Sequence, residues 1–80
     1  MKYSQSLIVF GERVRNFRKE KGMTQLDLSV ASDIDRRTIQ RIENGTGNHT
    51  FEIIVGLSLG LQIPLRELMD IEIQEVSYPS

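Results

Sequence analysis

Two short helices joined by a tight turn are predicted between residues 24 and 45, and this unit constrains the fold more than any other feature of the chain. Thr24 and Asp27 have the spacing of a capping box, with Asp in place of the usual Glu, and they predict a helix over residues 25–32. Asp33 follows, and this residue type tolerates the left-handed backbone conformation of a tight turn.

The second helix of the unit should begin after Asp35, whose side chain can cap residues 36–44. Ile39 and Ile42 are spaced to face inward, and Gly45 is placed to end the helix. The sequence GTGNH that begins at Gly45 predicts a loop by its composition.

Further helices are predicted on both sides of this unit. An apolar stripe with intervals of three, four and three residues predicts a first helix over about residues 6–21, and it consists of Leu7, Phe10, Val14 and Phe17. Thr50 can cap a fourth helix, and Pro64 begins a fifth over about residues 65–69. Five helices predict an all-α bundle in which the first helix packs across the second and third.

The chain is long enough for one domain with a single modest core. We assign that domain to residues 1–70. Residues 71–80 begin with alternating apolar and polar side chains, which fits either a short C-terminal strand or a frayed tail.

The charge of the chain is divided unevenly along its length. Residues 1–49 hold nine of the ten lysines and arginines and six acids, which gives a net charge of +3. Residues 50–80 hold one arginine and five acids, which gives −4. Such asymmetry suggests a nucleic-acid-binding face on the first part of the chain.

Composition excludes several classes of protein. The chain has no cysteine, so disulfides and cysteine-ligated metals are excluded, and one histidine offers no metal site. It has no glycine-rich phosphate loop and no paired carboxylates on one face, so we expect neither an enzyme nor a cofactor. No apolar run is long enough to span a membrane, and the N-terminus is unlike a signal peptide, so we expect a cytoplasmic protein without a membrane partner.

The segment MTQLDLSVASDIDRRTIQRIENG resembles the helix-turn-helix of the XRE family, the superfamily of the lambdoid phage repressors and Cro. Residues 10–22 resemble the first helix of the family, and residues 48–69 its fourth and fifth. The resemblance implies a five-helix lambda-repressor-like bundle and a DNA-binding transcription regulator. In this motif the helix after the turn, here residues 36–44, is called the recognition helix and enters the major groove of double-stranded DNA.

The resemblance also implies roles for individual residues. The exposed positions of the recognition helix, which would contact DNA bases, are Arg36, Arg37, Gln40 and Arg41. The positions that would contact DNA phosphates are Gln25, Asn44, Thr46, Asn48 and His49. Arg36 and Arg41 could serve phosphates instead of bases. Arg18 and Glu43 match a structural ion pair between the first and third helices.

Two groups of apolar or small residues depart from the family pattern. Leu26 and Val30 take outward positions of the second helix, where they are either bare surface or covered by the N-terminal arm or the tail at Ile71 and Ile73. The fourth helix has two interior glycines, which cost helix propensity and would let a helix of a second chain approach closely. We therefore expect a twofold homodimer there through Ile53, Gly56, Leu59 and Gly60.

A homodimer of this kind would bind a palindromic operator and repress by occlusion or activate by contact with polymerase. The alternative function is an antitoxin that autoregulates its operon and binds a toxin partner. The sequence leaves open the operator, the sign of regulation, any effector ligand, and the pathway, whether mobile element, restriction–modification control or toxin–antitoxin.

Overall fold

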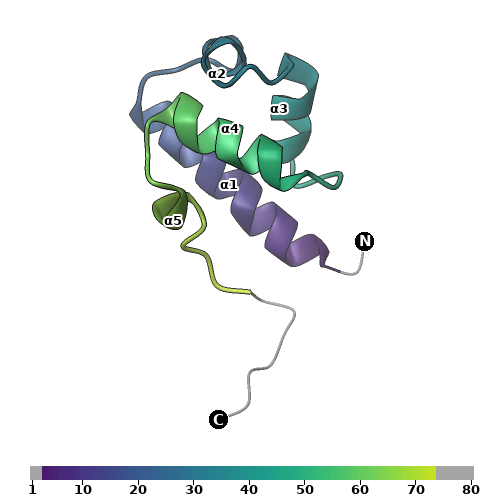
Figure 1. The fold of residues 1–80 in the computed structure, drawn as a ribbon. Helices are drawn as coiled ribbons and strands as arrows, with labels where there is room; N and C mark the ends of the chain where they lie inside the picture. Colours follow the sequence, from purple (N-terminus) through teal and green to yellow (C-terminus); the bar gives the residue numbers. More distant parts are fainter. Residues whose placement is uncertain (1–2, 74–80) are drawn as a thin grey trace.

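The computed structural model describes residues 3–73 of the chain and shows five helices (Figure 1). They are α1 (Ser4–Glu20), α2 (Gln25–Ser32), α3 (Arg36–Glu43), α4 (Phe51–Leu61) and α5 (Leu65–Leu68). Residues 3–73 contain no strand, so the predicted all-α class is correct. The segment 71–73 is irregular, and the rest of the predicted strand or tail, residues 74–80, lies outside the described residues.

The helices of the central unit begin at the predicted caps. Thr24 Oγ1 accepts a hydrogen bond from Asp27 N at 3.0 Å, and Asp27 Oδ2 accepts one from Thr24 N at 2.8 Å, which completes the capping box. The hydrogen bond from the Thr24 backbone lowers the pKa of Asp27, and the bond to its side chain adds to the effect. The predicted start of α2 is therefore confirmed.

Asp35 caps α3 in the same manner. Its carboxylate accepts a hydrogen bond from the Thr38 hydroxyl at 2.6 Å and another from Thr38 N at 3.0 Å. These bonds, with the hydroxyl as the larger cause, lower the pKa of Asp35. Between the two helices, Asp33 has a φ of 57°, the left-handed conformation that the sequence predicts for the turn.

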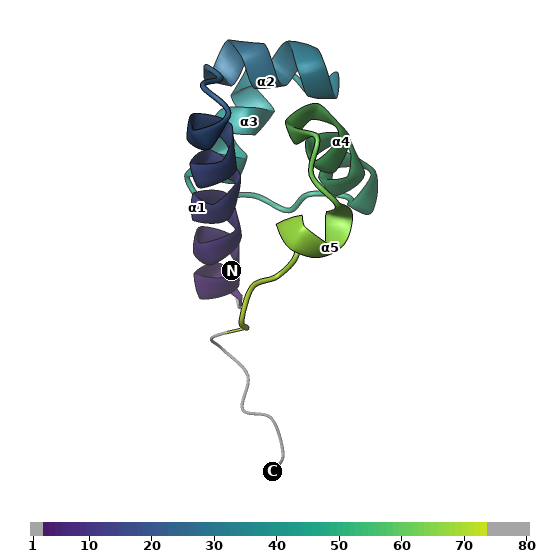
Figure 2. The same ribbon diagram turned by 90° about the vertical axis from the view of Figure 1, so that its left-hand side faces the viewer.

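The helices form a bundle in which α1 lies on one side, α4 and α5 lie on the other, and α2 lies across one end (Figure 2). α1 packs against α3, whereas α2 packs mainly against α4 and secondarily against α3. The prediction that α1 crosses both α2 and α3 is therefore right for α3 only, because α4 takes the main contact with α2. The short helix α5 follows α4 and packs beside it.

The core is built from every helix. The buried apolar side chains are Phe10, Val14, Leu28, Ile34, Ile39, Ile42, Leu57, Leu61, Ile63 and Leu68. Ile39 and Ile42 face inward as predicted, which leaves the opposite face of α3 to solvent. No helix within residues 3–73 has the length and apolarity needed to cross a bilayer.

The two glycines of α4 contact α2 of the same chain. A Cβ atom built on Gly60 would lie 2.8 Å from Ser32 Cβ, and one built on Gly56 would lie 3.2 Å from Ser32 O. Gly60 is also buried. The expectation that these glycines let a second chain approach is therefore wrong in its physical reason, because α2 already occupies the space beside them.

The two glycines provide a matched test of this contact. We expect Gly60→Ala to lower the free energy of unfolding by about 1–3 kcal/mol, because the added methyl overlaps the α2 backbone at Ser32. Gly56→Ala should cost less, because its nearest atom is farther away and alanine favours helix by about 1 kcal/mol. Urea unfolding measures both, and equal effects would contradict the packing described.

Candidate nucleic-acid interface

The outward face of α3 carries four polar side chains. It is formed by the four residues predicted to contact bases, Arg36, Arg37, Gln40 and Arg41, and all four are exposed. Because they are one and four positions apart, they form two adjacent rows along the helix. The structure thus brings the predicted set together on one surface with three guanidinium groups and one amide.

Arg41 lies at the edge of this surface, over the loop that joins α3 to α4. A Cβ atom on Gly47 would be 2.8 Å from Nη2 of Arg41, so the guanidinium group packs directly over the glycine. Gly47 has a φ of 82°, a conformation that other residues adopt only under strain. Arg41 therefore lies against the loop that is predicted to contact phosphate.

The loop between α3 and α4 carries the polar residues predicted to contact phosphate. Asn44, Thr46 and Asn48 are exposed, and His49 is half-buried. Nε2 of His49 lies 3.0 Å from the carbonyl oxygen of Thr46. Since a carbonyl oxygen only accepts, Nε2 donates this hydrogen bond, and the histidine ring helps to hold the loop.

Gln25, the remaining predicted phosphate contact, begins α2 and is half-buried. Its Nε2 donates a hydrogen bond to Glu43 Oε1 at 3.3 Å. Because a carboxylate can only accept, this bond sets which end of the amide faces Glu43. The side chain at the start of α2 is thus tied to the last residue of α3.

Glu43 is the acceptor at the centre of this network, and its side chain is fully buried. Arg18 Nε donates to Oε2 at 2.6 Å, and Arg18 Nη2 donates to Oε1 at 2.9 Å. Arg18 Nη1 also donates to Met23 O at 2.8 Å. The hydrogen bond to Glu43 raises the pKa of Arg18 above its usual value, against the effect of burial. The structure places these two residues in the ion pair that the resemblance implied.

A close approach of α1 to α3 makes this ion pair possible. A Cβ atom on Gly11 would be 2.2 Å from Ile42 O, so only glycine fits between the two backbones. Arg15 and Arg18 follow on the same face of α1 as Gly11, four and seven positions along. Arg15 Nε consequently lies 3.6 Å from Glu43 Oε1, with 42% of its side chain exposed. Sequence reasoning missed Arg15, although its spacing from Arg18 is a signal that could have found it.

Leu26 and Val30 remain uncovered on α2 among the described residues, with 53% and 77% of their surface exposed. Ile71 is half-buried and lies with Val9 and Phe17 of α1, not with α2. Of the alternatives raised by the sequence, a cover of Leu26 and Val30 by Ile71 is therefore wrong.

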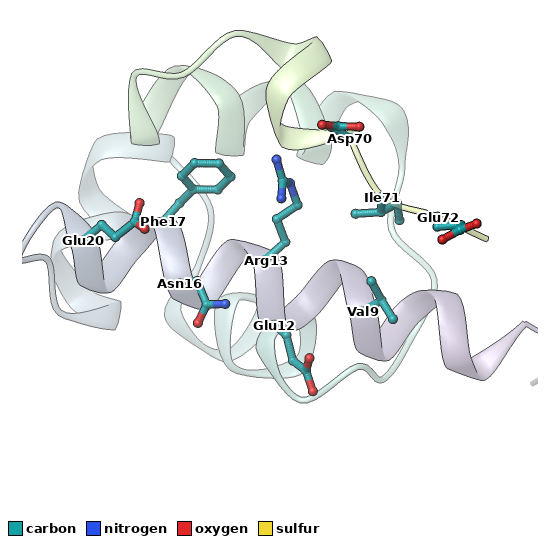
Figure 3. Close-up of a pocket in the computed structure, with 9 residues that line it drawn as sticks. All are labelled: Val9, Glu12, Arg13, Asn16, Phe17, Glu20, Asp70, Ile71 and Glu72. Carbon is teal, nitrogen blue, oxygen red and sulfur yellow. The ribbon is translucent and has the colours of Figure 1, made fainter. Parts of the chain in front are cut away.

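A surface cavity of about 470 Å³ lies between α1 and residues 70–72 (Figure 3). Arg13 crosses it, with its guanidinium 5.0 Å from the Phe17 ring and hydrogen bonds to Glu67 O. Four carboxylates line it and disfavour phosphate there, namely Glu12, Glu20, Asp70 and Glu72.

Within residues 3–73 no group of side chains is suited to hold a metal ion. The candidate interface is therefore the α2–α3 face.

Comparison with known proteins agrees with this geometry. A helix-turn-helix family model matches residues 14–68, which include α2, the turn and α3. The control protein C.MunI of a Mycoplasma species is 39% identical over 67 residues, or 81% of this chain and 90% of that protein. The control protein C.BamHI of Bacillus amyloliquefaciens is 34% identical over 64 residues, or 79% of each.

Two crystal structures are also similar. The restriction-modification controller protein C.AhdI from Aeromonas hydrophila superposes with a TM-score of 0.79 at 35% identity, over 81% of this chain and 98% of that chain. The restriction-modification controller protein C.Esp1396I superposes with a TM-score of 0.75 at 31% identity, over 80% and 83% of the two chains. The fold and the arrangement of the motif are thus shared with these proteins.

Removal of Glu43 should cost more stability than removal of an exposed charge. We expect Glu43→Ala to lower the free energy of unfolding by about 3–5 kcal/mol, because it leaves the buried Arg18 guanidinium without its partner. Glu52→Ala, at an exposed glutamate, is the control. A denaturant melt that moves equally for both variants would contradict the structural role of the ion pair.

Proposed function

Because this chain belongs to the XRE, or Cro/repressor-like, helix-turn-helix family of DNA-binding transcription regulators, we propose that it controls a restriction–modification system by binding its operator as a homodimer. The observation that carries this proposal is the exposed face of α3, where three arginines and a glutamine lie on one side of a helix that a buried ion pair holds in place. The control proteins among its relatives favour this pathway.

Base recognition is assigned chiefly to Arg37 and Gln40. Arginine can bind guanine O6 and N7 with two hydrogen bonds, and glutamine can bind adenine N6 and N7 in the same way. Both side chains are exposed on α3. Arg36 is a further candidate for base contact, whereas the position of Arg41 over Gly47 favours phosphate for that residue.

Phosphate contacts are assigned to both ends of the motif. Gln25 lies at the N-terminus of α2, where free backbone N–H groups also attract anions. The loop after α3 adds the exposed side chains of Asn44, Thr46 and Asn48, and the half-buried His49. Contacts at two places on the DNA phosphate backbone would fix the angle and register of α3 in the major groove.

The homodimer is assigned to the outward stripe of α4. Phe51, Val55 and Leu59 are four positions apart, and Phe51 and Leu59 are 68% and 72% exposed. Leu59 is the one residue of the four predicted from sequence that keeps a largely exposed side chain, since Ile53 packs against the core. A twofold dimer would present two α3 helices to half-sites about one helical turn apart.

The alternative functions have less support. The relatives reported above are control proteins, so they give no support to an antitoxin or to a toxin partner. The family consists of DNA-binding regulators rather than enzymes.

Base recognition is tested after selection of bound duplexes from a random DNA pool. We expect Arg37→Ala and Gln40→Ala each to lose about 1–3 kcal/mol of binding free energy on the selected duplex and little on mixed-sequence DNA. Gln25→Ala is the control and should weaken binding to both alike, because phosphates carry no sequence information. If the α3 variants lose the same amount on both duplexes, the assignment of base contacts is wrong.

Dimer formation is tested by light scattering at high micromolar concentration. We expect the wild-type protein to have twice the 9.2 kDa mass of one chain and Leu59→Glu to have the mass of one. Val30→Glu, at a similarly exposed apolar residue of α2, is the control and should stay dimeric. A wild-type mass of 9.2 kDa would rule out the homodimer.

A further inference from the structure

We propose that Arg15 of α1 binds a DNA phosphate together with the start of α2, and that Glu43 positions it for this contact. We call the group formed by Arg15, Gln25 and Glu43 the Glu43 clamp. The inference rests on the proposed DNA binding and adds a contact from a third helix to those on α2 and α3. It follows from the arrangement of hydrogen-bond donors around one buried carboxylate oxygen.

A single oxygen brings the two donors of the clamp together. Glu43 Oε1 lies 3.3 Å from Nε2 of Gln25 and 3.6 Å from Nε of Arg15. These side chains come from different helices, α2 and α1, and their nitrogens meet at the same atom. One phosphate group could therefore contact both, because each of its oxygens accepts several hydrogen bonds.

Arg15 keeps the donors that such a contact needs. Arg18 already binds both oxygens of Glu43 at 2.6 and 2.9 Å and so takes the main hydrogen-bonding role. The 3.6 Å separation of Arg15 from Glu43 exceeds the usual length of an N–H···O hydrogen bond. The carboxylate thus attracts the Arg15 guanidinium by its charge without accepting a hydrogen bond from Nε, and 42% of the Arg15 side chain is exposed to solvent.

The start of α2 supplies the other half of the clamp. The amide nitrogen of Gln25 has two hydrogens, and its bond to Glu43 uses one of them. The backbone N–H groups of Gln25 and Leu26 precede the first hydrogen bond within the helix, from Leu28 N to Thr24 O. The nearby carboxylate of Asp27 accepts a hydrogen bond from Thr24 N, and this bond holds the negative charge of Asp27 at the helix cap.

The charges around the carboxylate of Glu43 favour an anion. Two guanidinium groups, those of Arg15 and Arg18, face the single carboxylate of Glu43, so one positive charge is left without a local partner. A DNA phosphate would neutralise it. Because Glu43 is buried and the arginine is half-exposed, the carboxylate draws Arg15 toward Gln25 before DNA arrives.

The experiment measures how binding to a mixed-sequence DNA duplex depends on salt. Each neutralised phosphate contributes about 0.9 to the slope of log K against log salt concentration. We expect Arg15→Gln to lower the magnitude of the slope by about 0.9, and Arg15→Lys to retain it because the charge remains. A mixed-sequence duplex suffices, since phosphate contacts do not depend on the operator.

Arg66→Gln is the matched control. Arg66 is exposed on α5, which lies away from α2 and α3 in both views (Figures 1 and 2), so its loss should leave the slope unchanged. Thermal melts of all variants verify that each remains folded.

The outcomes separate this inference from the proposed function. A slope for Arg15→Gln equal to that of the wild type would overturn the clamp and leave DNA binding intact. An equal decrease for Arg66→Gln would also overturn it, because the effect would then reflect net charge rather than a local contact. A wild-type protein that does not bind the duplex would refute the proposed function and the clamp together.

Discussion

The buried carboxylate of Glu43 connects the parts of this molecule that have to act together on DNA. It accepts two hydrogen bonds from Arg18 of α1 and one from Gln25 of α2, while it belongs to α3 itself. A buried charge is tolerated only when its partners are complete, so these bonds restrict how the three helices can be arranged. The recognition helix is therefore fixed at its C-terminal end by the same group that orients the start of α2.

Close contacts at small residues set the distances on which this network depends. Gly11 lets α1 touch the backbone of α3, which brings Arg15 and Arg18 within reach of Glu43. On the other side, Gly56 and Gly60 let α4 approach α2 at Ser32. α1 and α4 thus pack against the motif from two sides. The exposed face of α3 takes no part in these contacts. That separation allows α3 to carry four polar side chains without loss of the core.

The fold could be predicted from sequence wherever a local interaction decides the structure. The capping box at Thr24, the caps at Asp35 and Thr50, and the left-handed turn at Asp33 depend on neighbours within a few residues, and all are present. The partner of α2 and the purpose of the α4 glycines depend on residues far apart in the chain. Both were predicted wrongly, because helical periodicity shows which face is apolar but not which helix covers it.

The sequence by itself determined the five helices, the helix-turn-helix and the exposed polar set on α3, because caps and periodicity act locally and the motif resembles a known family. Only the tertiary structure decided that Arg41 lies over Gly47, that the α4 glycines belong to the α2 contact, and that Arg15 meets Gln25 at Glu43. These facts depend on distances between helices, and such distances follow from how side chains and backbones of distant segments pack.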